Sequence, residues 1–335
     1  MVFTGGREDP RVEGSNSTPL VVVVTPTYNG SAYLRETMDS VQAQTYPNLI
    51  HLVLDNASTD EVPAILADYA DTRVPVIRIR NATTLPQKEN WNTAFGHVPS
   101  EATYVRLLCD DDTITPDSIA RMVAVAETDP KINVVGCWHH SFGDIQKLKW
   151  PADRTLFDGP EAVRMTLLSQ GELMPMQMMW RKAAVDRLQP LFSDEIYMMW
   201  DLDTAMELMM QGKYAFIHEC LGFTRVHPGT VTAQLNLVGT RVSTRNAADL
   251  LRKYGPAVLG ADYAKEMRRF LRYYVRRILM WRREPEAKDW LGSHYQALQR
   301  AGWSWGPPKV ADALFFWALQ RVGLVAGWTG FPGWQ

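Results

Sequence analysis

The chain has 335 residues, of which 46% are hydrophobic and 21% are charged, so it can bury the core of one large or two modest globular domains. This composition excludes a disordered tail and a peptide-sized module. A formal net charge of −2 gives no overall positive field for a nucleic-acid backbone, and we expect no nucleic-acid partner.

The two ends of the chain and its cysteines indicate the compartment. Residues 1–18 contain no apolar segment of a signal peptide, so we expect a disordered N-terminal segment. No apolar run reaches the roughly 18 residues of a membrane-spanning helix. Cys109, Cys137 and Cys220 are too few and too scattered for a disulfide framework or a zinc site. We expect a cytoplasmic protein, with the inner face of the cell membrane as a second option.

Apolar runs and amphipathic segments alternate through the first 137 residues. The first run, at 20–25, contains four consecutive valines between two prolines and is typical of a strand buried on both faces. Ser31 is a candidate N-cap for the helix that follows. Further strands are predicted at 50–54, 76–80, 104–109 and 133–137, and helices at 32–44, 62–69, 90–97 and 117–127. This order predicts an α/β protein with a doubly wound, mostly parallel sheet.

The pattern loosens over residues 138–171 and then resumes, with a strand from Pro175, a helix at 205–211 and a strand at 214–218. The segment 246–281 is predicted to form a basic amphipathic helix, and 309–326 a last, largely apolar helix. In the basic helix Arg268, Arg269, Arg272 and Arg276 share one side.

Polar residues follow three of the predicted strands, at 25–29, 55–60 and 110–112, where an open α/β sheet binds ligands. Neither the dinucleotide fingerprint nor the P-loop is present, so phosphate needs another counter-charge. Asp110, Asp111 and Asp112, the Asp triplet, offer hard oxygen ligands for Mg²⁺ or Mn²⁺, which bridges diphosphate oxygens. The alternative is a solvated turn that caps the helix after Pro116.

The order of these motifs resembles the family 2 glycosyltransferases of GT-A fold. Residues 22–29 (VVVTPTYN) look like the first strand and nucleotide loop of that family, and 55–60 (DNASTD) like its second loop. Residues 90–94 (NWNTA) match the segment before the metal strand, and the Asp triplet stands in place of the DxD motif. The stretch 200–203 (WDLD) stands where the family carries its catalytic base, and 225–229 (RVHPG) matches the closing segment.

The resemblance implies three regions. Residues 19–232 would form the GT-A domain, with a nucleotide-binding half at 19–137 and an acceptor-binding half at 138–232, and 233–335 a C-terminal helical region. There are two departures from the family pattern: Cys109 replaces the usual first Asp of the metal motif, and Trp200 replaces the acidic residue before the base.

The resemblance also implies the roles of site residues. The nucleotide would contact Thr25, Pro26, Thr27, Tyr28, Asp55, Lys88 and Asp110. Tyr28 would flank the base, while Asp55 would accept from a base imide or merely shape an Asx-turn. Lys88 would lie over the diphosphate or remain solvated. Mn²⁺ or Mg²⁺ would be held by Asp111, assisted by Asp112, with His227 as a further metal or diphosphate ligand or a turn residue.

Asp201 is the candidate general base, placed to take the acceptor proton on the face of the sugar opposite the leaving group, which inverts the anomeric carbon. The alternative for Asp201 is an N-cap of the helix at 205–211, and Asp203 is the expected structural carboxylate. The resemblance thus implies an inverting, metal-dependent transferase that uses a nucleoside-diphosphate sugar and a saccharide or lipid-linked acceptor in surface polysaccharide synthesis. A sugar nucleotidyltransferase and an inactive sugar-nucleotide-binding protein are the alternatives.

The C-terminal region carries Arg side chains and tryptophans that suit a lipid headgroup region. The tryptophans are Trp281, Trp290, Trp303, Trp305, Trp317, Trp328 and Trp334. Three arrangements are open: peripheral contact with a membrane, a homodimer, or packing of the apolar side on the catalytic domain.

Overall fold

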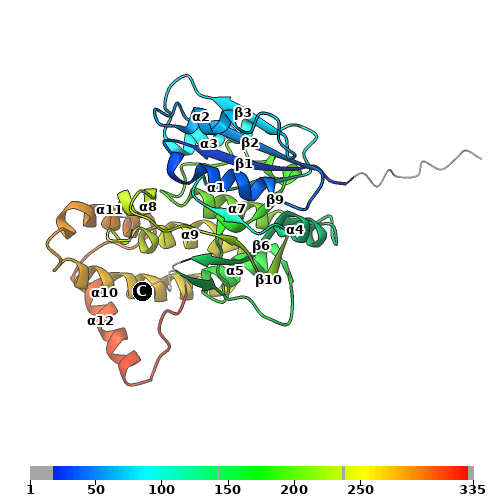
Figure 1. Ribbon diagram of the computed structural model, residues 1–335. Coiled ribbons are helices and arrows are strands. Elements are labelled where there is room, and N and C mark those ends of the chain that lie inside the picture. The colour runs from blue at the N-terminus through cyan, green and yellow to red at the C-terminus, as the bar shows by residue number, and fades with distance from the viewer. Residues whose placement is uncertain (1–17, 142, 236–237, 331–335) are drawn as a thin grey trace, which may run out of the picture.

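The computed structural model describes residues 18–141, 143–235 and 238–330. The predicted disorder of residues 1–18 therefore falls outside the described residues, except at Thr18. The centre of the molecule is a ten-stranded mixed sheet (Figure 1). Eight of its strands follow the order β3-β2-β1-β4-β9-β6-β10-β5, while β7 pairs with β6 and β8 pairs with β10. Its strands are β1 (Val21–Thr27), β2 (Leu49–Asp55), β3 (Val76–Arg80), β4 (Tyr104–Leu107), β5 (Thr113–Ile114), β6 (Ile132–Ser141), β7 (Asp144–Gln146), β8 (Leu156–Asp158), β9 (Met179–Arg181) and β10 (Lys213–Phe223).

The pairs β1 with β2, β2 with β3, β1 with β4, and β6 with β10 are parallel. Strand β9 lies between β4 and β6 and is antiparallel to both. The α/β class with a mostly parallel sheet is confirmed.

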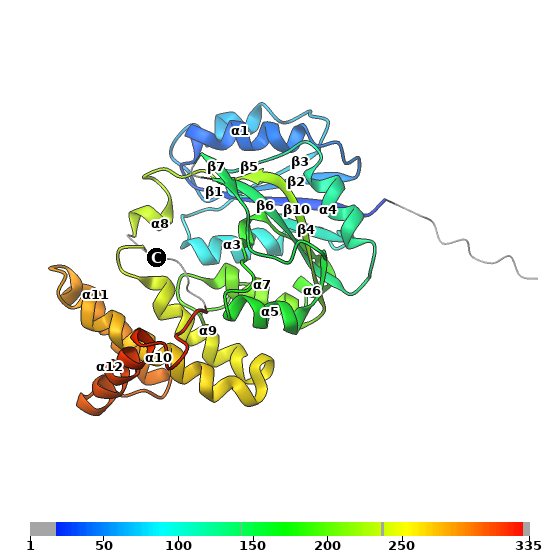
Figure 2. The same cartoon turned by 90° about the horizontal axis from the view of Figure 1, so that it is seen from below.

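Helices cover both faces of the sheet, as Figure 2 shows. They are α1 (Ser31–Gln42), α2 (Val62–Ala67), α3 (Gln87–Gly96), α4 (Ser118–Ala126), α5 (Gly159–Leu167), α6 (Lys182–Val185), α7 (Trp200–Met210), α8 (Val231–Gln234), α9 (Val242–Leu259), α10 (Tyr263–Trp281), α11 (Ala287–Arg300) and α12 (Pro307–Arg321), with 3-10 turns η1 (Pro175–Gln177) and η2 (Gly260–Asp262). Alternate valines of β1 explain this cover: Val22 and Val24 join the core on the α3 face, while Val21 and Val23 join the core on the α4 face.

Helix α1 begins where predicted, but Ser31 is not its N-cap. Gly30 occupies that position, and the Ser31 amide instead donates to Asp60 Oδ2 at 2.9 Å. The loop after β1 is therefore tied to the loop after β2, which brings two of the three polar motifs together.

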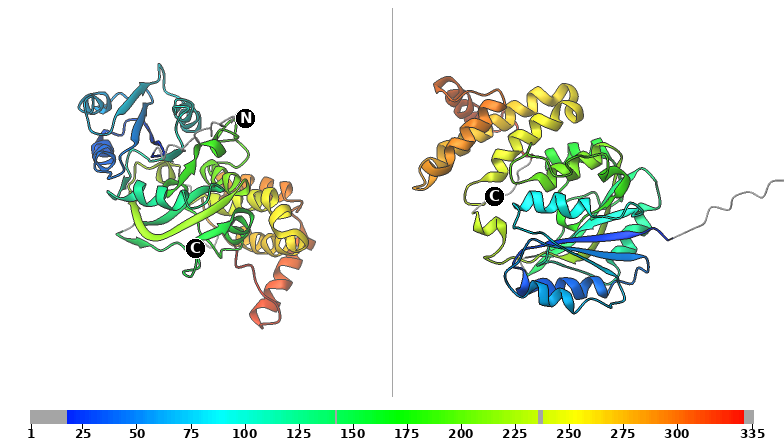
Figure 3. Two further views of the ribbon diagram at one scale, coloured as in Figure 1. Left: turned by 90° about the vertical axis from the view of Figure 1, so that its right-hand side faces the viewer. Right: turned by 90° about the horizontal axis from the view of Figure 1, so that it is seen from above.

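The predicted single helix at 246–281 is wrong in one respect: the chain forms α9 and α10, separated by η2. Gly260 ends α9 with a φ of +51°, a left-handed conformation that glycine adopts without a Cβ clash. The apolar side of α10 is buried through Phe270, Leu271, Tyr274, Val275 and Ile278. One hydrophobic cluster runs from the sheet through α9 into α10, so the C-terminal helices pack on the part of the chain that forms the sheet (Figure 3).

Helix α11 was not predicted from the sequence. Within the described ranges, no helix is both long enough and apolar enough to cross a bilayer. Helix α8 spans the predicted boundary between residues 232 and 233.

Candidate active site

Three polar loops meet at the carboxyl ends of β1, β2 and β4. Thr27 Oγ1 donates to Asp110 Oδ2 at 2.5 Å, which links the loop after β1 to the Asp triplet. The Asn29 amide donates to Ser58 Oγ at 2.9 Å, which links the same loop to the one after β2. Because parallel strands end at one edge of the sheet, residues more than eighty positions apart form one site.

The end of β1 keeps its side chains buried, and the loop that follows exposes the Tyr28 ring. Thr25, Pro26 and Thr27 are buried in β1, whereas Tyr28 is 50% exposed. Thr25 Oγ1 lies 2.9 Å from His51 Nε2. Burial lowers the pKa of His51 to about 3, so this ring is neutral. The Thr25 hydroxyl therefore contacts His51 of the neighbouring strand β2. This does not support the predicted contact of that hydroxyl with a ligand.

Asp55 lies at the end of β2 and is almost fully buried. Its Oδ1 accepts from the Ser58 amide at 2.8 Å, which is the Asx-type turn considered from the sequence. Its Oδ2 is paired with Arg80 at the end of β3. Arg80 also donates to the Ser58 carbonyl at 2.8 Å and is about half exposed, so it extends this loop's polar surface.

Lys88, in the first turn of α3, pairs with Asp194 and lies 3.8 Å from Glu89. Its side chain is largely covered, while the Asp194 side chain is exposed. A diphosphate in this position would have to compete with Asp194 for the ammonium group.

The Asp triplet follows β4 in a turn that the Asp112 amide closes by donating to the Cys109 carbonyl at 3.2 Å. Cys109 Sγ and carboxylate oxygens of Asp111 and Asp112 all lie within 4.8 Å of one another. Asp110 is not in that group, because its carboxylate faces Thr27. The turn therefore directs Asp110 toward the loop after β1, while the carboxylates of Asp111 and Asp112 lie close to each other.

The electrostatics of the triplet fit a divalent cation. Burial raises the pKa of Asp110 to about 6, and burial together with the charge of Asp111 raises the pKa of Asp112 to about 8. Burial also raises the pKa of the Cys109 thiol well above its usual value, and the nearby carboxylates raise it further. Cys109 is then a neutral thiol, so the donor set is one of hard carboxylate oxygens, which suits Mg²⁺ and Mn²⁺.

The segment after β10 closes over the triplet. The Arg225 amide donates to Asp112 Oδ1 at 2.9 Å, and Arg225 Nε donates to the Asp111 carbonyl at 3.0 Å. His227 Nε2 lies 3.0 Å from Asp111 Oδ2, and the Gly229 amide donates to His227 Nδ1 at 3.2 Å. Because Nδ1 accepts, we assign the proton of the neutral ring to Nε2, where it is donated to Asp111.

Asp201 lies in the first turn of α7 rather than at its N-cap, which is Met199. The predicted N-cap alternative is therefore wrong. The carboxylate accepts from the Leu202 amide at 2.8 Å, and burial raises its pKa to about 6. Asp201 is close enough to Cys109 for its charge to raise the pKa of that thiol, as do the charges of the triplet. Cys109 is thus grouped with Asp111 and Asp112, and Asp201 is within electrostatic range of it.

Helix α7 is fixed to the C-terminal region by a cluster centred on Lys253 of α9. Lys253 Nζ lies 2.8 Å from both oxygens of Asp203, 3.0 Å from Glu195 and 2.5 Å from Glu207. The three acids could otherwise hold a metal ion, but the chain supplies the cation itself. Asp203 is therefore the structural carboxylate that was expected, and its partners come from a region beyond the predicted domain boundary.

Replacing Lys253 with methionine is expected to lower the free energy of unfolding by about 2 kcal/mol. A fully buried pair is worth about 3–5 kcal/mol when one partner is removed, but Glu195 and Glu207 keep part of their contact with water. Urea unfolding measures the change. Lys288→Met, at an exposed position of α11, serves as the control, and equal stability of the two variants would contradict a clamp on α7.

Gly30 is required by the approach of Asp110 to the loop after β1. A Cβ at position 30 would lie 2.1 Å from Asp110 Oδ2 and 2.8 Å from Thr27 Oγ1. Gly30→Ala is therefore expected to displace Asp110, break its bond to Thr27, and destabilise the fold by about 1–3 kcal/mol. Thermal unfolding and calorimetric titration of a nucleoside diphosphate check both effects.

Gly96→Ala is the matched control, because a Cβ at the end of α3 meets no atom within 4 Å. It is expected to leave the protein as stable as the wild type or slightly more stable. If Gly30→Ala behaves in the same way, the packing of Asp110 against this loop is unimportant.

Sequence reasoning missed two participants, Arg80 and Gly30. Arg225 was identified from the sequence only as part of the closing segment 225–229. Each acts through a partner far away in the chain: Arg80 on Asp55, Gly30 beside Asp110, and Arg225 on Asp111 and Asp112. An arginine that ends a strand beside a polar turn was the available signal for Arg80.

Comparison with known proteins gives these features a context. The sequence model of glycosyl transferase family 2 matches residues 22–188. The uncharacterized glycosyltransferase RT0329 of Rickettsia typhi is 26% identical over 231 residues, which are 64% of this chain and 66% of that protein. The putative teichuronic acid biosynthesis glycosyltransferase TuaG of Bacillus subtilis is 30% identical over 113 residues, 32% of this chain and 42% of that protein. The chain spans 14% to 66% of the length of three curated relatives that it matches.

Two solved structures share the fold. S. aureus TarS in complex with UDP has a TM-score of 0.58 and 18% identity, over 84% of this chain and 82% of that chain. The mannosyltransferase PcManGT of Pyrobaculum calidifontis, in complex with GDP-Man and Mn²⁺, has a TM-score of 0.54 and 17% identity, over 91% of this chain and 81% of that chain. The GT-A fold expected from the sequence is confirmed.

Proposed function

Because the chain belongs to glycosyl transferase family 2, whose model matches residues 22–188, we propose that it transfers a sugar from a nucleoside-diphosphate sugar to an acceptor hydroxyl, with inversion at the anomeric carbon. The observation that carries the proposal is the meeting of the loops after β1 and β2 with the Asp triplet at one edge of the sheet, with Asp201 close enough for its charge to act on Cys109. In the proposed reaction the triplet serves the leaving diphosphate and Asp201 serves the attacking hydroxyl.

The proposed reaction is a single displacement. The acceptor oxygen forms its bond to the anomeric carbon as the bond from that carbon to the diphosphate breaks, and the hydroxyl proton passes to Asp201. A general base works best when its pKa lies near the working pH, and the value of about 6 leaves Asp201 ionised at neutral pH. Inversion follows from attack on the face opposite the leaving group.

The proposed donor site combines the nucleotide loop and the triplet. Tyr28 flanks the base, the loop of Asp55 lies beside it, and Asp110 reaches the ribose. TarS in its complex with UDP, and PcManGT in its complex with GDP-Man and Mn²⁺, support a nucleoside-diphosphate donor for this chain.

The proposed cation site uses Asp111 and Asp112, with His227 as the neighbouring imidazole. A bound Mn²⁺ or Mg²⁺ supplies positive charge for the diphosphate as negative charge develops on it. The chain's own part is to hold these ligands: Arg225 bonds to the carboxylate of Asp112 and the carbonyl of Asp111, and His227 bonds to the Asp111 carboxylate. The raised pKa of Asp112, which comes from burial and from the charge of Asp111, supports this assignment, since a nearby cation would favour the charged carboxylate.

We propose a saccharide or lipid-linked acceptor and a role in surface polysaccharide synthesis, supported by the name of TuaG. We also propose a cytoplasmic location at the inner face of the cell membrane. Cys109, Cys137 and Cys220 are all free thiols, which suits a reducing compartment.

A panel of nucleotide sugars tests the proposal. Each is added to the purified protein with and without Mn²⁺, and thermal unfolding and release of the nucleoside diphosphate are measured. One donor is expected to raise the melting temperature in the presence of Mn²⁺ and to be slowly hydrolysed. A panel that leaves both readouts unchanged, with nucleoside diphosphates also failing to stabilise the protein, would overturn the proposed donor class.

A further inference from the structure

The charges of the chain are divided unequally between its two parts. Residues 261–335 carry twelve Lys and Arg side chains and six Asp and Glu, a formal charge of +6, while the whole chain carries −2. Residues 1–260 therefore carry −8. The positive part begins at α10, beyond the candidate active site, so the mechanism makes no use of this charge.

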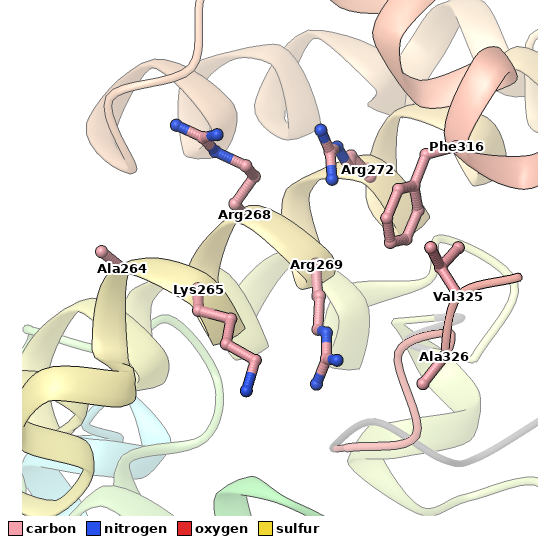
Figure 4. Close-up of a pocket in the computed structure, with 8 residues that line it drawn as sticks. All are labelled: Ala264, Lys265, Arg268, Arg269, Arg272, Phe316, Val325 and Ala326. Carbon is pink, nitrogen blue, oxygen red and sulfur yellow. The ribbon is translucent and has the colours of Figure 1, made fainter. Parts of the chain in front are cut away.

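Four of these cations line a pocket between α10 and α12. Lys265, Arg268, Arg269 and Arg272 come from successive turns of α10, and the opposite wall is apolar, formed by Phe316, Val325 and Ala326 (Figure 4). The cavity measures about 500 Å³, within the range of ligand pockets. It can hold a phosphate group together with the first atoms attached to it.

The cations of this basic pocket are only partly neutralised. Arg272 forms a bidentate pair with Asp312, at 2.8 and 2.7 Å, and lies over the Phe316 ring. Arg269 pairs with Glu266 at 2.8 Å, and Lys265 lies 3.7 Å from Asp262. Arg268 is exposed, and in the described part of the chain it has no ion-pair partner. The pocket therefore keeps a guanidinium group free for an anion, beside others that are already held in place.

Helix α12 turns an apolar surface to solvent beside this pocket. Leu314 is 45% exposed, Phe315 is 66% exposed and Val322 is 67% exposed. These residues share one side of the helix with Ala311 and Ala318, because they recur at helical spacing. Ala313 is the buried member of α12. An ordinary surface helix has the reverse pattern, with polar residues outside.

The pocket and the outer face of α12 (Ala311, Leu314, Phe315, Ala318 and Val322) are built by residues that neighbour one another along the chain. Phe316 lines the pocket next to Phe315 on the outer face, and Leu324, 71% exposed, directly precedes Val325 of the pocket wall. The helix lies at the end of the molecule away from the sheet (Figure 1). Of the tryptophans singled out in the sequence, Trp281 and Trp303 are buried, Trp317 is exposed, and Trp334 lies outside the described residues.

A membrane fits this combination better than a second copy of the chain. In a twofold dimer through α12, each copy would bring its own +6 region to the same interface, and like charges would face each other. An anionic bilayer brings the opposite charge, and it offers phosphate groups at the depth of the headgroups and acyl chains just below.

We propose that α12 docks on an anionic membrane, with its outer face inserted at the headgroup boundary and a lipid phosphate bound in the basic pocket. This docking is independent of the proposed sugar transfer, because it uses no residue of the candidate active site. It would hold the active site near a bilayer.

Vesicle flotation tests the docking. The full chain is mixed with phosphatidylcholine vesicles, with or without phosphatidylglycerol, at low and high salt. Stronger binding to the anionic vesicles, weakened by salt, is expected. Arg268→Glu changes two charges and is expected to lower the partition coefficient about thirtyfold, from about fivefold for each charge. Phe315→Ser is expected to lower it about tenfold, through lost apolar burial.

Two exposed positions elsewhere provide matched controls: Lys288→Glu on α11 and Ile145→Ser on β7. Lys288→Glu gives the part of the charge effect that is unrelated to the pocket, and Ile145→Ser is expected to bind as the wild type does. The proposal is overturned if the wild type does not float with anionic vesicles at low salt, or if Arg268→Glu loses no more binding than Lys288→Glu. It is also overturned if light scattering shows a dimer that Phe315→Ser dissociates. Nucleotide binding, measured on every variant, reports separately on the proposed function.

Discussion

Replacing Asp201 with asparagine is expected to lower the turnover number for sugar transfer by about 100-fold to 10,000-fold, the usual contribution of a general base. Asparagine keeps the size of the side chain and can still accept from the Leu202 amide, so α7 is expected to keep its place. It cannot take a proton from the acceptor. Steady-state kinetics with the donor identified by the nucleotide-sugar panel measure the effect.

The pH dependence provides an independent check of Asp201. Burial raises its pKa to about 6, and the base acts only when it is ionised. Activity is therefore present above pH 6 and is lost as the pH falls through 6, about tenfold for each further unit. In Asp201→Asn the residual activity is expected to lose this acidic limb. Because Asp110 has a similar pKa, donor binding is titrated over the same range to separate binding from turnover.

Asp186→Asn is the control for Asp201→Asn. Asp186 pairs with Lys182 at the surface and is about half exposed, so its loss is expected to change little. Turnover of Asp201→Asn close to that of the control, with both variants folded, would rule out Asp201 as the base.

Replacing Asp111 with alanine is expected to weaken Mn²⁺ binding by more than about 100-fold, because even partners outside the ligand shell contribute 10-fold to 100-fold to metal affinity. The variant also loses the carboxylate that His227 contacts. A nucleoside diphosphate is then expected to bind with the same low affinity whether or not Mn²⁺ is present. Calorimetric titration in both conditions measures this difference.

Asp68→Ala is the control for Asp111→Ala, since Asp68 forms an exposed pair with Arg35. It is expected to keep the full effect of Mn²⁺ on nucleotide affinity. If the wild type itself binds the nucleoside diphosphate equally well with and without Mn²⁺, the assignment of a cation site to the triplet is wrong.

The sequence predicted the elements that have strong local patterns. The nucleotide-binding half of the molecule was predicted from the buried valines of β1 and from the polar residues that end β1, β2 and β4. Strand β3 has the bounds that were predicted. The weaker patterns were less informative: α11 was missed, and the single helix at 246–281 is divided at Gly260. Gly260 was the local signal for this break, and the prediction did not use it.

Candidate residue types were readable from the sequence, but their partners were not. Asp55, Lys88 and His227 were singled out, and only the tertiary structure placed Arg80, Asp194 and Asp111 beside them. In the same way, Cys109 was noticed as a departure from a motif, and folding placed it within 4.8 Å of carboxylate oxygens of Asp111 and Asp112.

The sequence by itself determined the α/β class, the order of the polar loops and the excess of positive charge in residues 261–335, because periodicity and composition are local properties of the chain. The tertiary structure decided which surfaces remain exposed. The sequence of α10 predicted a basic amphipathic helix, and its apolar side is covered by neighbouring elements. The apolar side that is exposed to solvent belongs to α12. Exposure depends on which elements meet in space, and those contacts join residues too far apart for any local pattern to record.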